Sequence, residues 1–280
     1  MSTTASTNFI SSFDTLVKKQ YQGQMKLRGT VRVKSGVTGS THRFPVINKG
    51  VATPRIPQTD ITPMNVVHGN ATATLEDWNA ADYSDVYDLA KLNFDERKEL
   101  VDTATTAIGR RLDQLIIDAM DTGASATQVS DDLGGTNTGL NIEKILRAKR
   151  LMDDQGVPSD GRRHMAVSAY AVEQALQEAE IASADYNLLM PLMKGEITDF
   201  SGFKIHMIES RDEGGLSVAT NVRKNFAWHQ DAVGLAIGVD MRTEVNYIAE
   251  KTSTLINSLF SAGSVVIDSL GVYEVLTYEA

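Results

Sequence analysis

The sequence predicts an α+β fold in which helices and strands follow one another without the regular strand–helix–strand alternation of a parallel sheet. Three observations lead to this prediction. A proline-rich extended segment precedes one long amphipathic helix, and a stretch of short helices and strands comes next. From Asn225 onward the chain has the pattern of consecutive strands. We find no internal repeat.

The first expected element is a short amphipathic helix over residues 9–21. Apolar residues, Phe9 and Phe13 among them, recur there at helical spacing, and Lys18 and Lys19 lie on the opposite side. We refer to this N-terminal segment as the arm.

An extended ribbon is expected after the arm. From Gly29 the pattern alternates with period two, and a second extended run covers 42–47, which predicts a long hairpin between these two runs. Four of the six prolines fall between residues 45 and 63, which excludes helix there. A ribbon of this length has little core of its own, so we expect something outside the chain to cover it.

A long helix follows the ribbon. Asn93 and Glu96 have the spacing of a capping box, and apolar residues then recur every three or four positions until Gly123. The prediction is a helix over about 93–122, roughly 45 Å long at about 1.5 Å per residue. We call it the spine helix.

The remaining elements are shorter. A glycine-rich loop covers 131–139, and a helix begins at Asn141 and ends by Gly156. A turn at 157–162, a strand at 163–167, a helix from Ser168 and a strand at 203–207 follow. The last strands are expected at 226–239, 243–249, 254–260, 264–267 and 272–278.

Composition narrows the class of protein. A chain of 280 residues and 30.5 kDa can bury a large core, and 42% hydrophobic with 22% charged residues is typical of globular proteins. No apolar run approaches the roughly 20 residues of a membrane span. The start, Met1 to Asn8, has no secretory signal pattern, so we expect folding in a cytoplasm. The lack of cysteine excludes disulfides, thiolate nucleophiles and cysteine-based metal sites.

The net charge of −9 argues against a uniformly basic nucleic-acid binder, but the charges are strongly segregated. No acidic residue occurs between Thr15 and Thr59, and no basic residue occurs between Asp60 and Ala90. The first stretch carries nine basic residues, which leaves a formal charge of −18 on the rest of the chain. The basic stretch could track phosphates, could lie across the acidic body of a neighbouring copy, or could be a solvated strand face.

The search for catalytic or metal-binding motifs finds no signature. No two of the five histidines lie three to five residues apart, as a helix-borne metal pair requires. The loop at 134–139 has the glycines of a phosphate loop without the following Lys-Ser or Lys-Thr, so we interpret it as a connector. Asp131 and Asp132 beside it could bind calcium only weakly, since the full ligand series is missing. We expect no catalytic, cofactor or metal site, and a cytosolic hydrolase with dispersed catalytic residues stays a remote alternative.

The order of arm, ribbon, spine helix and mixed domain resembles the major capsid proteins of tailed bacteriophages with the HK97-like fold. Residues 151–168, LMDDQGVPSDGRRHMAVS, look like the helix, V-P-x-x-G-R turn and strand that open the A-domain of podovirus-type members. Residues 195–205, GEITDFSGFKI, are similar to their G-x-[IV]-x-x-[FIL]-x-G-F-x-[IV] segment, and 113–119 also fits. The resemblance covers roughly residues 8–278.

The resemblance implies a non-enzymatic protein that forms hexamers and pentamers of an icosahedral shell around double-stranded DNA. It implies an N-terminal arm at 1–28, an E-loop at 29–83, a P-domain at 84–138 and 238–262, and an A-domain at 139–237 and 263–280. The early start of the arm favours a separate scaffolding protein. A portal and a decoration protein are further expected partners, with only weak non-specific contacts to packaged DNA. An encapsulin-like cargo shell is the alternative with the same fold.

The expected location is the virion shell, assembled in the cytoplasm of a host bacterium. Some family members crosslink through a lysine of the E-loop, but no motif here supports carrying that chemistry over. We expect Trp78 to serve as an interface anchor and Trp228 as a core or interface residue. The expected inter-subunit contacts are apolar and basic residues of the arm and ribbon and the acidic stretch around Trp78: Phe9, Phe13, Lys18, Lys19, Arg28, Arg32, Lys34, Arg43, Lys49, Arg55, Asp77, Trp78, Asp82 and Asp85.

Overall fold

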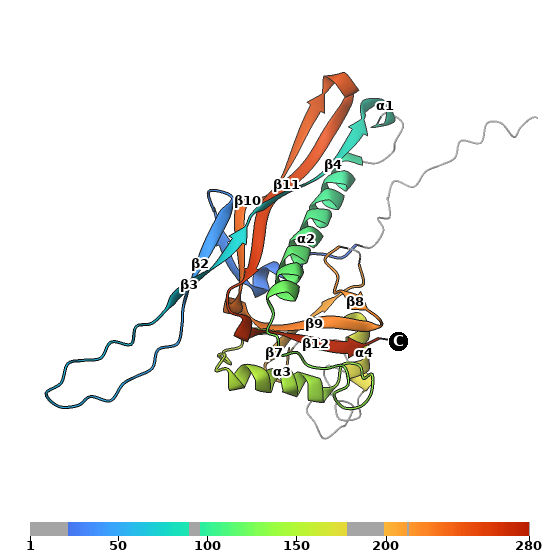
Figure 1. Cartoon of the computed structure of the whole chain (residues 1–280). Helices are drawn as coiled ribbons and strands as arrows, with labels where there is room; N and C mark the ends of the chain where they lie inside the picture. Colours follow the sequence, from blue (N-terminus) through green and yellow to red (C-terminus); the bar gives the residue numbers. More distant parts are fainter. Residues whose placement is uncertain (1–21, 90–95, 178–198, 212, 280) are drawn as a thin grey trace, which may run out of the picture.

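The computed structural model describes residues 22–89, 96–177, 199–211 and 213–279, and it contains two lobes and one projecting loop (Figure 1). The spine lobe is built on a four-stranded sheet with the order β1-β10-β11-β4. Its strands are β1 Arg32–Ser35, β4 Glu76–Asp85, β10 Val233–Ile248 and β11 Ser253–Val266. Strands β10, β11 and β4 are antiparallel neighbours, whereas β1 is parallel to β10.

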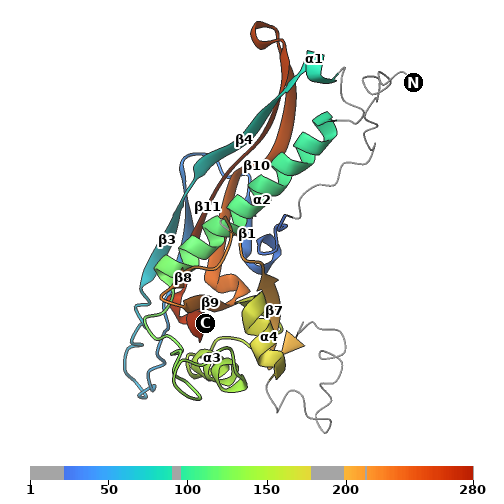
Figure 2. The ribbon, with the colours of Figure 1, turned by 90° about the vertical axis from the view of Figure 1, so that its right-hand side faces the viewer.

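The helix α2, Glu96–Gly123, lies along one face of this sheet (Figures 1 and 2). Its residues Ile108, Leu112 and Ile116 recur every four positions and are buried in the shared core. Glu96 and Glu99 lie in its first turn, where their negative charges interact favourably with the positive end of the helix dipole. The predicted spine helix is therefore confirmed over these 28 residues. The proposed cap at Asn93 lies outside the described residues. A short helix, α1 Val86–Leu89, follows β4.

The mixed lobe is built on a sheet with the order β12-β9-β5-β7-β6, with β8 paired to β9. Helices α3 and α4 pack on one face of it, and the other face packs on the core that contains α2. The side chain of Asn141 accepts a hydrogen bond from the Lys144 backbone N–H and so begins α3 as predicted. The elements are β5 Arg163–Ser168, β6 Asp199–Phe200, β7 Phe203–Ile208, β8 Val218–Ala219, β9 Val222–His229, β12 Val272–Tyr278, α3 Ile142–Asp154 and α4 Ala169–Gln177.

The predicted hairpin between the two alternating runs near residues 31 and 44 is wrong. Strand β1 pairs with β10, and the hairpin forms instead between β2 Thr41–Ile47 and β3 His68–Thr74. Its base is held by Phe44, whose ring lies over Gly234, where an added Cβ would be 2.7 Å from the ring. Period-two alternation identifies strands but not their partners, which are set by packing between distant segments.

The predicted boundaries of the last strands also differ from the structure. The strand expected at 226–239 is interrupted by a 3-10 turn at Gln230–Ala232, which separates β9 from β10. The two strands expected at 254–260 and 264–267 are one continuous strand, β11. Gly263 does not end it: a Cβ there would be 1.9 Å from the Thr74 carbonyl oxygen, so glycine allows β3 to pass close by.

The two lobes and the entering chain meet at the buried carboxylate of Asp113 on α2. Its two oxygens accept hydrogen bonds from the backbone N–H groups of Lys26 and Leu27, each at 3.0 Å, and from Arg211 Nη2 at 2.9 Å. Burial raises the pKa of Asp113, whereas these donors favour the charged carboxylate. Close by, Trp228 Nε1 donates to the Thr30 carbonyl oxygen at 2.9 Å. Trp228 is therefore a core residue, which confirms one of the two roles expected for it.

We predict that Asp113→Ala lowers the free energy of unfolding by about 3–5 kcal/mol, because it leaves a buried guanidinium and two buried N–H groups without their acceptor. Asp118→Ala, an exposed position on the same helix, should change it by less than about 0.5 kcal/mol. Denaturant unfolding of both variants measures the difference. Equal stabilities would contradict the role given to Asp113.

Candidate inter-subunit surfaces

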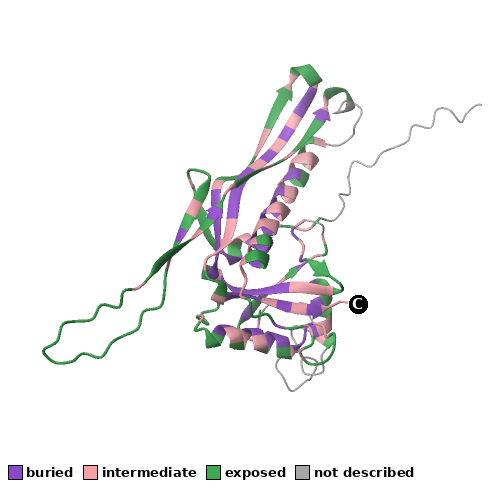
Figure 3. Ribbon diagram, viewed as in Figure 1, coloured by how far each residue is buried: buried purple, intermediate pink, exposed green. Residues whose placement is uncertain are grey.

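The loop between β2 and β3, residues 48–67, contacts the mixed lobe at Lys49 and projects beyond both lobes from there, and nearly all of it is exposed (Figures 1 and 3). We call it the tip loop. It carries large apolar side chains in solvent: Val51 is 76% exposed, Ile56 63% and Ile61 90%. A group of exposed apolar residues on one segment marks a surface that binds another molecule. The expected exposed ribbon is therefore present, although its strands pair differently from the prediction.

The basic residues expected at interfaces fall into three groups. Arg28 forms an ion pair with Asp240 at 2.9 Å, and Lys49 Nζ donates to the Gln155 carbonyl oxygen at 3.4 Å, so both have partners within the subunit. Four exposed residues make no ion pair within the described part of the chain: Arg32, Lys34, Arg43 and Arg55. The expected contact residues Phe9, Phe13, Lys18 and Lys19 lie outside the described residues.

The acidic residues expected at interfaces do not form one surface. Successive side chains of a strand point to opposite faces, and the unbroken register between β4 and β11 places Asp77 and Asp85 on one face of the sheet. Asp82 lies on the other face, the one that carries Trp78 and α2. These residues share the sign of their charge and are close in sequence, which predicted one surface, but the alternation of β4 divides them between two faces.

Trp78 packs within its own subunit. It is half-buried against the core shared by the sheet and α2, and the guanidinium carbon of Arg111 lies 3.6 Å from its ring centroid. This cation–π contact and the packing hold the ring within its own subunit, and the buried Nε1 of Trp78 has no hydrogen-bond partner among the described residues. A role for Trp78 as an interface anchor stays a prediction.

The family model for phage capsid proteins matches residues 5–279, which is nearly the whole chain. The chain belongs to the phage capsid protein family. Curated protein sequences give no match. Neither the encapsulin-like alternative nor the hydrolase alternative is favoured by the family match or by the solved structures that resemble this chain.

Solved phage capsids have the same fold as this capsid protein. The capsid of cyanophage P-SCSP1u has a TM-score of 0.77 at 16% sequence identity, covering 98% of this chain and 94% of that one. The head of Helicobacter pylori bacteriophage KHP40 has a TM-score of 0.79 at 11% identity, with coverage of 99% and 98%. The capsid of Ralstonia phage GP4 has a TM-score of 0.71 at 10% identity, with coverage of 99% and 97%.

The capsid protein thus has the HK97-like fold and is a structural major capsid protein that forms an oligomeric shell of the virion. The mixed α and β content and the order of its segments confirm the predicted fold class. Within the described residues no helix is long and apolar enough to cross a membrane.

Two histidines of the capsid protein that are far apart in sequence lie together in the mixed lobe. His164 Nδ1 on β5 and His206 Nε2 on β7 are 3.0 Å apart, and the Trp228 ring stacks on His164. Burial lowers the pKa of His164 to about 4, assisted by the nearby His206 and Lys204, and burial also lowers the pKa of His206. The pair is therefore neutral near pH 7. Spacing along the sequence gave no signal for this pair, because adjacent strands bring it together.

The glycine-rich loop after α2 surrounds the positively charged side chain of a buried lysine. Lys144 is buried, and its Nζ donates to the carbonyl oxygens of Asp131 at 3.0 Å and Thr138 at 2.6 Å. Burial lowers the pKa of Lys144 to about 8, and the carboxylates of Asp131 and Asp132 oppose this effect. Among the described residues, no group of three or more acidic or histidine side chains could hold a metal ion.

We predict that the capsid subunit loses stability as the pH falls from about 6.5 to about 4. The unfolded chain binds a proton at His164 near pH 6.5, whereas the folded chain does so only near pH 4, so protons favour unfolding in this window. Melting temperatures of unassembled subunits between about pH 7 and pH 5 measure the slope. His164→Asn should flatten it, and His68→Asn, an exposed position on β3, should not. Equal slopes in all three proteins would contradict the assignment.

Proposed function

We propose that this major capsid protein assembles into hexamers and pentamers of an icosahedral shell that encloses the double-stranded DNA of a tailed phage. One observation carries the proposal: the tip loop exposes apolar side chains that none of the described residues of its own subunit covers. A monomer gains nothing from such a loop, because its exposed apolar surface and its ordering both cost free energy. A closed lattice offers every copy a neighbour that can cover it.

Charge supports the same mechanism. Four basic residues of the ribbon have no ion pair within the described part of the subunit, and the chain outside the basic stretch carries a formal charge of −18. Complementary potentials steer two copies together and fix their register. We propose that the ribbon lies on the neighbouring subunit, that the helix expected at 9–21 packs beneath another copy, and that loops of the mixed lobe meet at the capsomer axis.

The domain division belongs to this proposal. The arm is 1–28, the E-loop is 29–83, the P-domain is 84–138 with 238–262, and the A-domain is 139–237 with 263–280. Within the E-loop range, β2 and β3 form the projecting hairpin, whereas β1 and β4 complete the sheet of the spine lobe. The E-loop is therefore anchored in the P-domain sheet at both ends. This anchoring gives the loop a fixed direction.

The remaining partners are also proposed. Assembly takes place in the host cytoplasm with a separate scaffolding protein and a portal, and a decoration protein can bind the finished shell. Packaged DNA makes only weak, non-specific contacts with the part of the chain outside the basic stretch, which has a net negative charge. Strong binding to DNA phosphates needs clustered basic residues that face the DNA.

Electron microscopy of the purified protein tests the shell directly. We expect closed particles, and nuclease-protected double-stranded DNA in particles isolated from infected cells. Purified protein that stays monomeric under all assembly conditions would contradict the proposed function. Particles that enclose protein cargo without DNA would favour the encapsulin-like alternative.

We predict that reversing Arg32, Lys34 and Arg43 together to glutamate reduces the fraction of protein in shells by more than about tenfold, because like charges at the contact oppose association. All three side chains are exposed and unpaired in the described part of the subunit, so its melting temperature should stay near that of the wild type. Sedimentation measures the shell fraction. Shells of normal size and yield would contradict the role of these residues.

We also predict that salt weakens the association of capsid subunits. The Debye length falls from about 8 Å at physiological ionic strength to about 3 Å at 1 M, so attraction between exposed charges is screened. Light scattering during assembly at increasing salt measures the rate. A rate that does not depend on salt would mean that charge makes no contribution to the encounter of subunits.

A further inference from the structure

The histidine pair of the mixed lobe consists of His164 on β5 and His206 on β7. The parallel register of β5 and β7 places Ala166 opposite His206, and the antiparallel register of β5 and β9 places Trp228 opposite His164. These four residues therefore lie on one face of the sheet. His164 is 6% exposed and His206 is half-buried, so the strands hold both rings in place and a small ion can reach the pair from the side of His206.

The geometry of the pair fits a single metal ion. Nδ1 of His164 and Nε2 of His206 are 3.0 Å apart and the ring centroids are 5.2 Å apart, so the rings meet at their nitrogen atoms and not face to face. Imidazole nitrogens bind zinc at about 2.0–2.1 Å, which places two nitrogens in adjacent coordination positions about 2.9–3.4 Å from each other. The observed separation lies within this range. Rotation of the half-buried His206 ring can then direct both lone pairs to one point.

The two rings can bind an ion without losing a proton. Burial lowers the pKa of both histidines, so both rings are neutral near pH 7. A neutral imidazole has one N–H and one nitrogen with a free lone pair, and in the pair one ring donates to the other. When an ion binds, the shared proton moves to the outer nitrogen of the donating ring. Both inner nitrogens then bind the ion through their lone pairs, and each ring keeps one proton.

The charged groups around the pair favour a metal that is held by nitrogen ligands. Lys204 and Lys26 bring positive charge near the rings, and Asp199 brings negative charge. Lys26 is paired with Glu209, and the long side chain of the exposed Lys204 can keep its ammonium group in solvent. An ion that relies on carboxylate oxygens, such as Ca²⁺ or Mg²⁺, gains little here. Cu²⁺ and Zn²⁺ bind well to imidazole nitrogen.

We propose that His164 and His206 together bind one divalent ion of a late transition metal, Cu²⁺ or Zn²⁺. Water completes the coordination, because no third histidine or acidic side chain among the described residues joins the pair. The ion links β5 to β7, and it stabilises the folded subunit because the unfolded chain does not hold the two imidazoles together. Binding is a property of the single subunit and does not depend on shell assembly.

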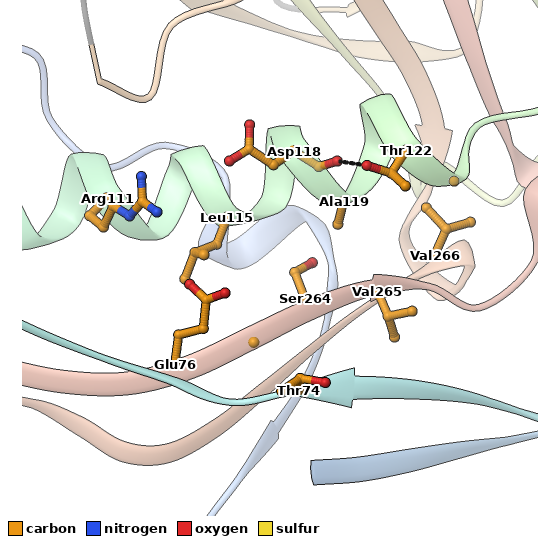
Figure 4. Close-up of a pocket in the computed structure, with 12 residues that line it drawn as sticks. Thr74, Glu76, Arg111, Leu115, Asp118, Ala119, Thr122, Ser264, Val265 and Val266 are labelled. Carbon is orange, nitrogen blue, oxygen red and sulfur yellow. Dashed lines mark hydrogen bonds between the residues drawn. The ribbon is translucent and has the colours of Figure 1, made fainter. Parts of the chain in front are cut away.

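A second place where a cation could collect is a cavity of about 360 Å³ between α2 and the sheet of the spine lobe (Figure 4). Glu76 on β4 and Asp118 on α2 line it, and both are exposed. Figure 4 shows that their carboxylate groups do not point toward one another. No histidine lines the cavity, and Arg111 adds a positive charge. It therefore lacks the ligands that these metals prefer, and its carboxylates provide a control.

Titration of unassembled subunits with Cu²⁺ tests the site. The Trp228 ring stacks on His164 with the centroids 5.9 Å apart, so Cu²⁺ bound to the pair should quench the fluorescence of Trp228. The chain has two tryptophans, so Trp78→Phe leaves Trp228 as the only one and serves as the parent protein. We expect saturable quenching by one Cu²⁺ per subunit. Zn²⁺, which does not quench, should compete for the same site.

Variants of this parent locate the ligands. His164→Asn and His206→Gln should each raise the Kd for Cu²⁺ by about tenfold or more, because loss of a direct ligand costs at least as much affinity as loss of a group behind it. His68→Asn on β3, and Glu76→Gln with Asp118→Asn in the cavity, should leave the Kd within about twofold, since sites without shared partners act independently. Melting temperatures with a chelator present show whether each variant folds.

A measurement on the wild type needs no substitution. Diethyl pyrocarbonate modifies accessible histidines, and mass spectrometry follows each one. Zn²⁺ at about ten times its Kd should slow the modification of His206 about tenfold, because only about a tenth of the sites are then free, and should leave His68 unchanged. Equal Kd values in the parent and in both pair variants, or modification of His206 that Zn²⁺ does not slow, would overturn the metal site. Loss of Cu²⁺ binding in both pair variants together with protection of His206 supports it.

Discussion

Asp113 lies where three parts of the subunit meet, and its carboxylate is fully buried there. Removing a carboxylate from water costs several kcal/mol unless charged and polar partners surround it. Its partners come from segments that are remote in sequence: the entering chain at Lys26 and Leu27, and the loop of the mixed lobe at Arg211. These donors converge on Asp113 only when both lobes and the entering chain are in their native positions. We therefore interpret Asp113 as the contact that selects this arrangement.

The direction of the projecting hairpin follows from this junction. Beyond Leu27, the Thr30 carbonyl oxygen accepts a hydrogen bond from Trp228, and β1 then runs parallel to β10. The chain turns from there into β2, whose Phe44 is held against Gly234. Trp228, Thr30 and Phe44 are buried, and β1 is paired to β10 although its side chains are exposed, so the base of the hairpin is fixed while its tip loop stays in solvent. An apolar loop held at a fixed angle is ready to bind a neighbour without a large loss of conformational entropy.

The charges of the subunit divide into those used inside it and those left for its surface. Lys144, Arg211 and Arg163 are buried against carbonyl or carboxylate oxygens, where they order loops and turns. Arg55 and the exposed cations of β1 and β2 have no such partners in the described part of the chain. The net charge of −9 therefore combines two populations. Only the unpaired population bears on association, since an internal ion pair is already neutralised.

The order and type of most elements could be predicted from the amino-acid sequence, because periodicity, caps and prolines act locally. The spine helix, the cap at Asn141 and the exposed tip loop could all be predicted in this way. The strand pairing, the contact between His164 and His206, and the cavity lined by Glu76 and Asp118 are visible only in the folded chain. Strand partners and such clusters depend on packing between segments far apart in the chain, and a period-two pattern is the same whichever neighbour the strand takes.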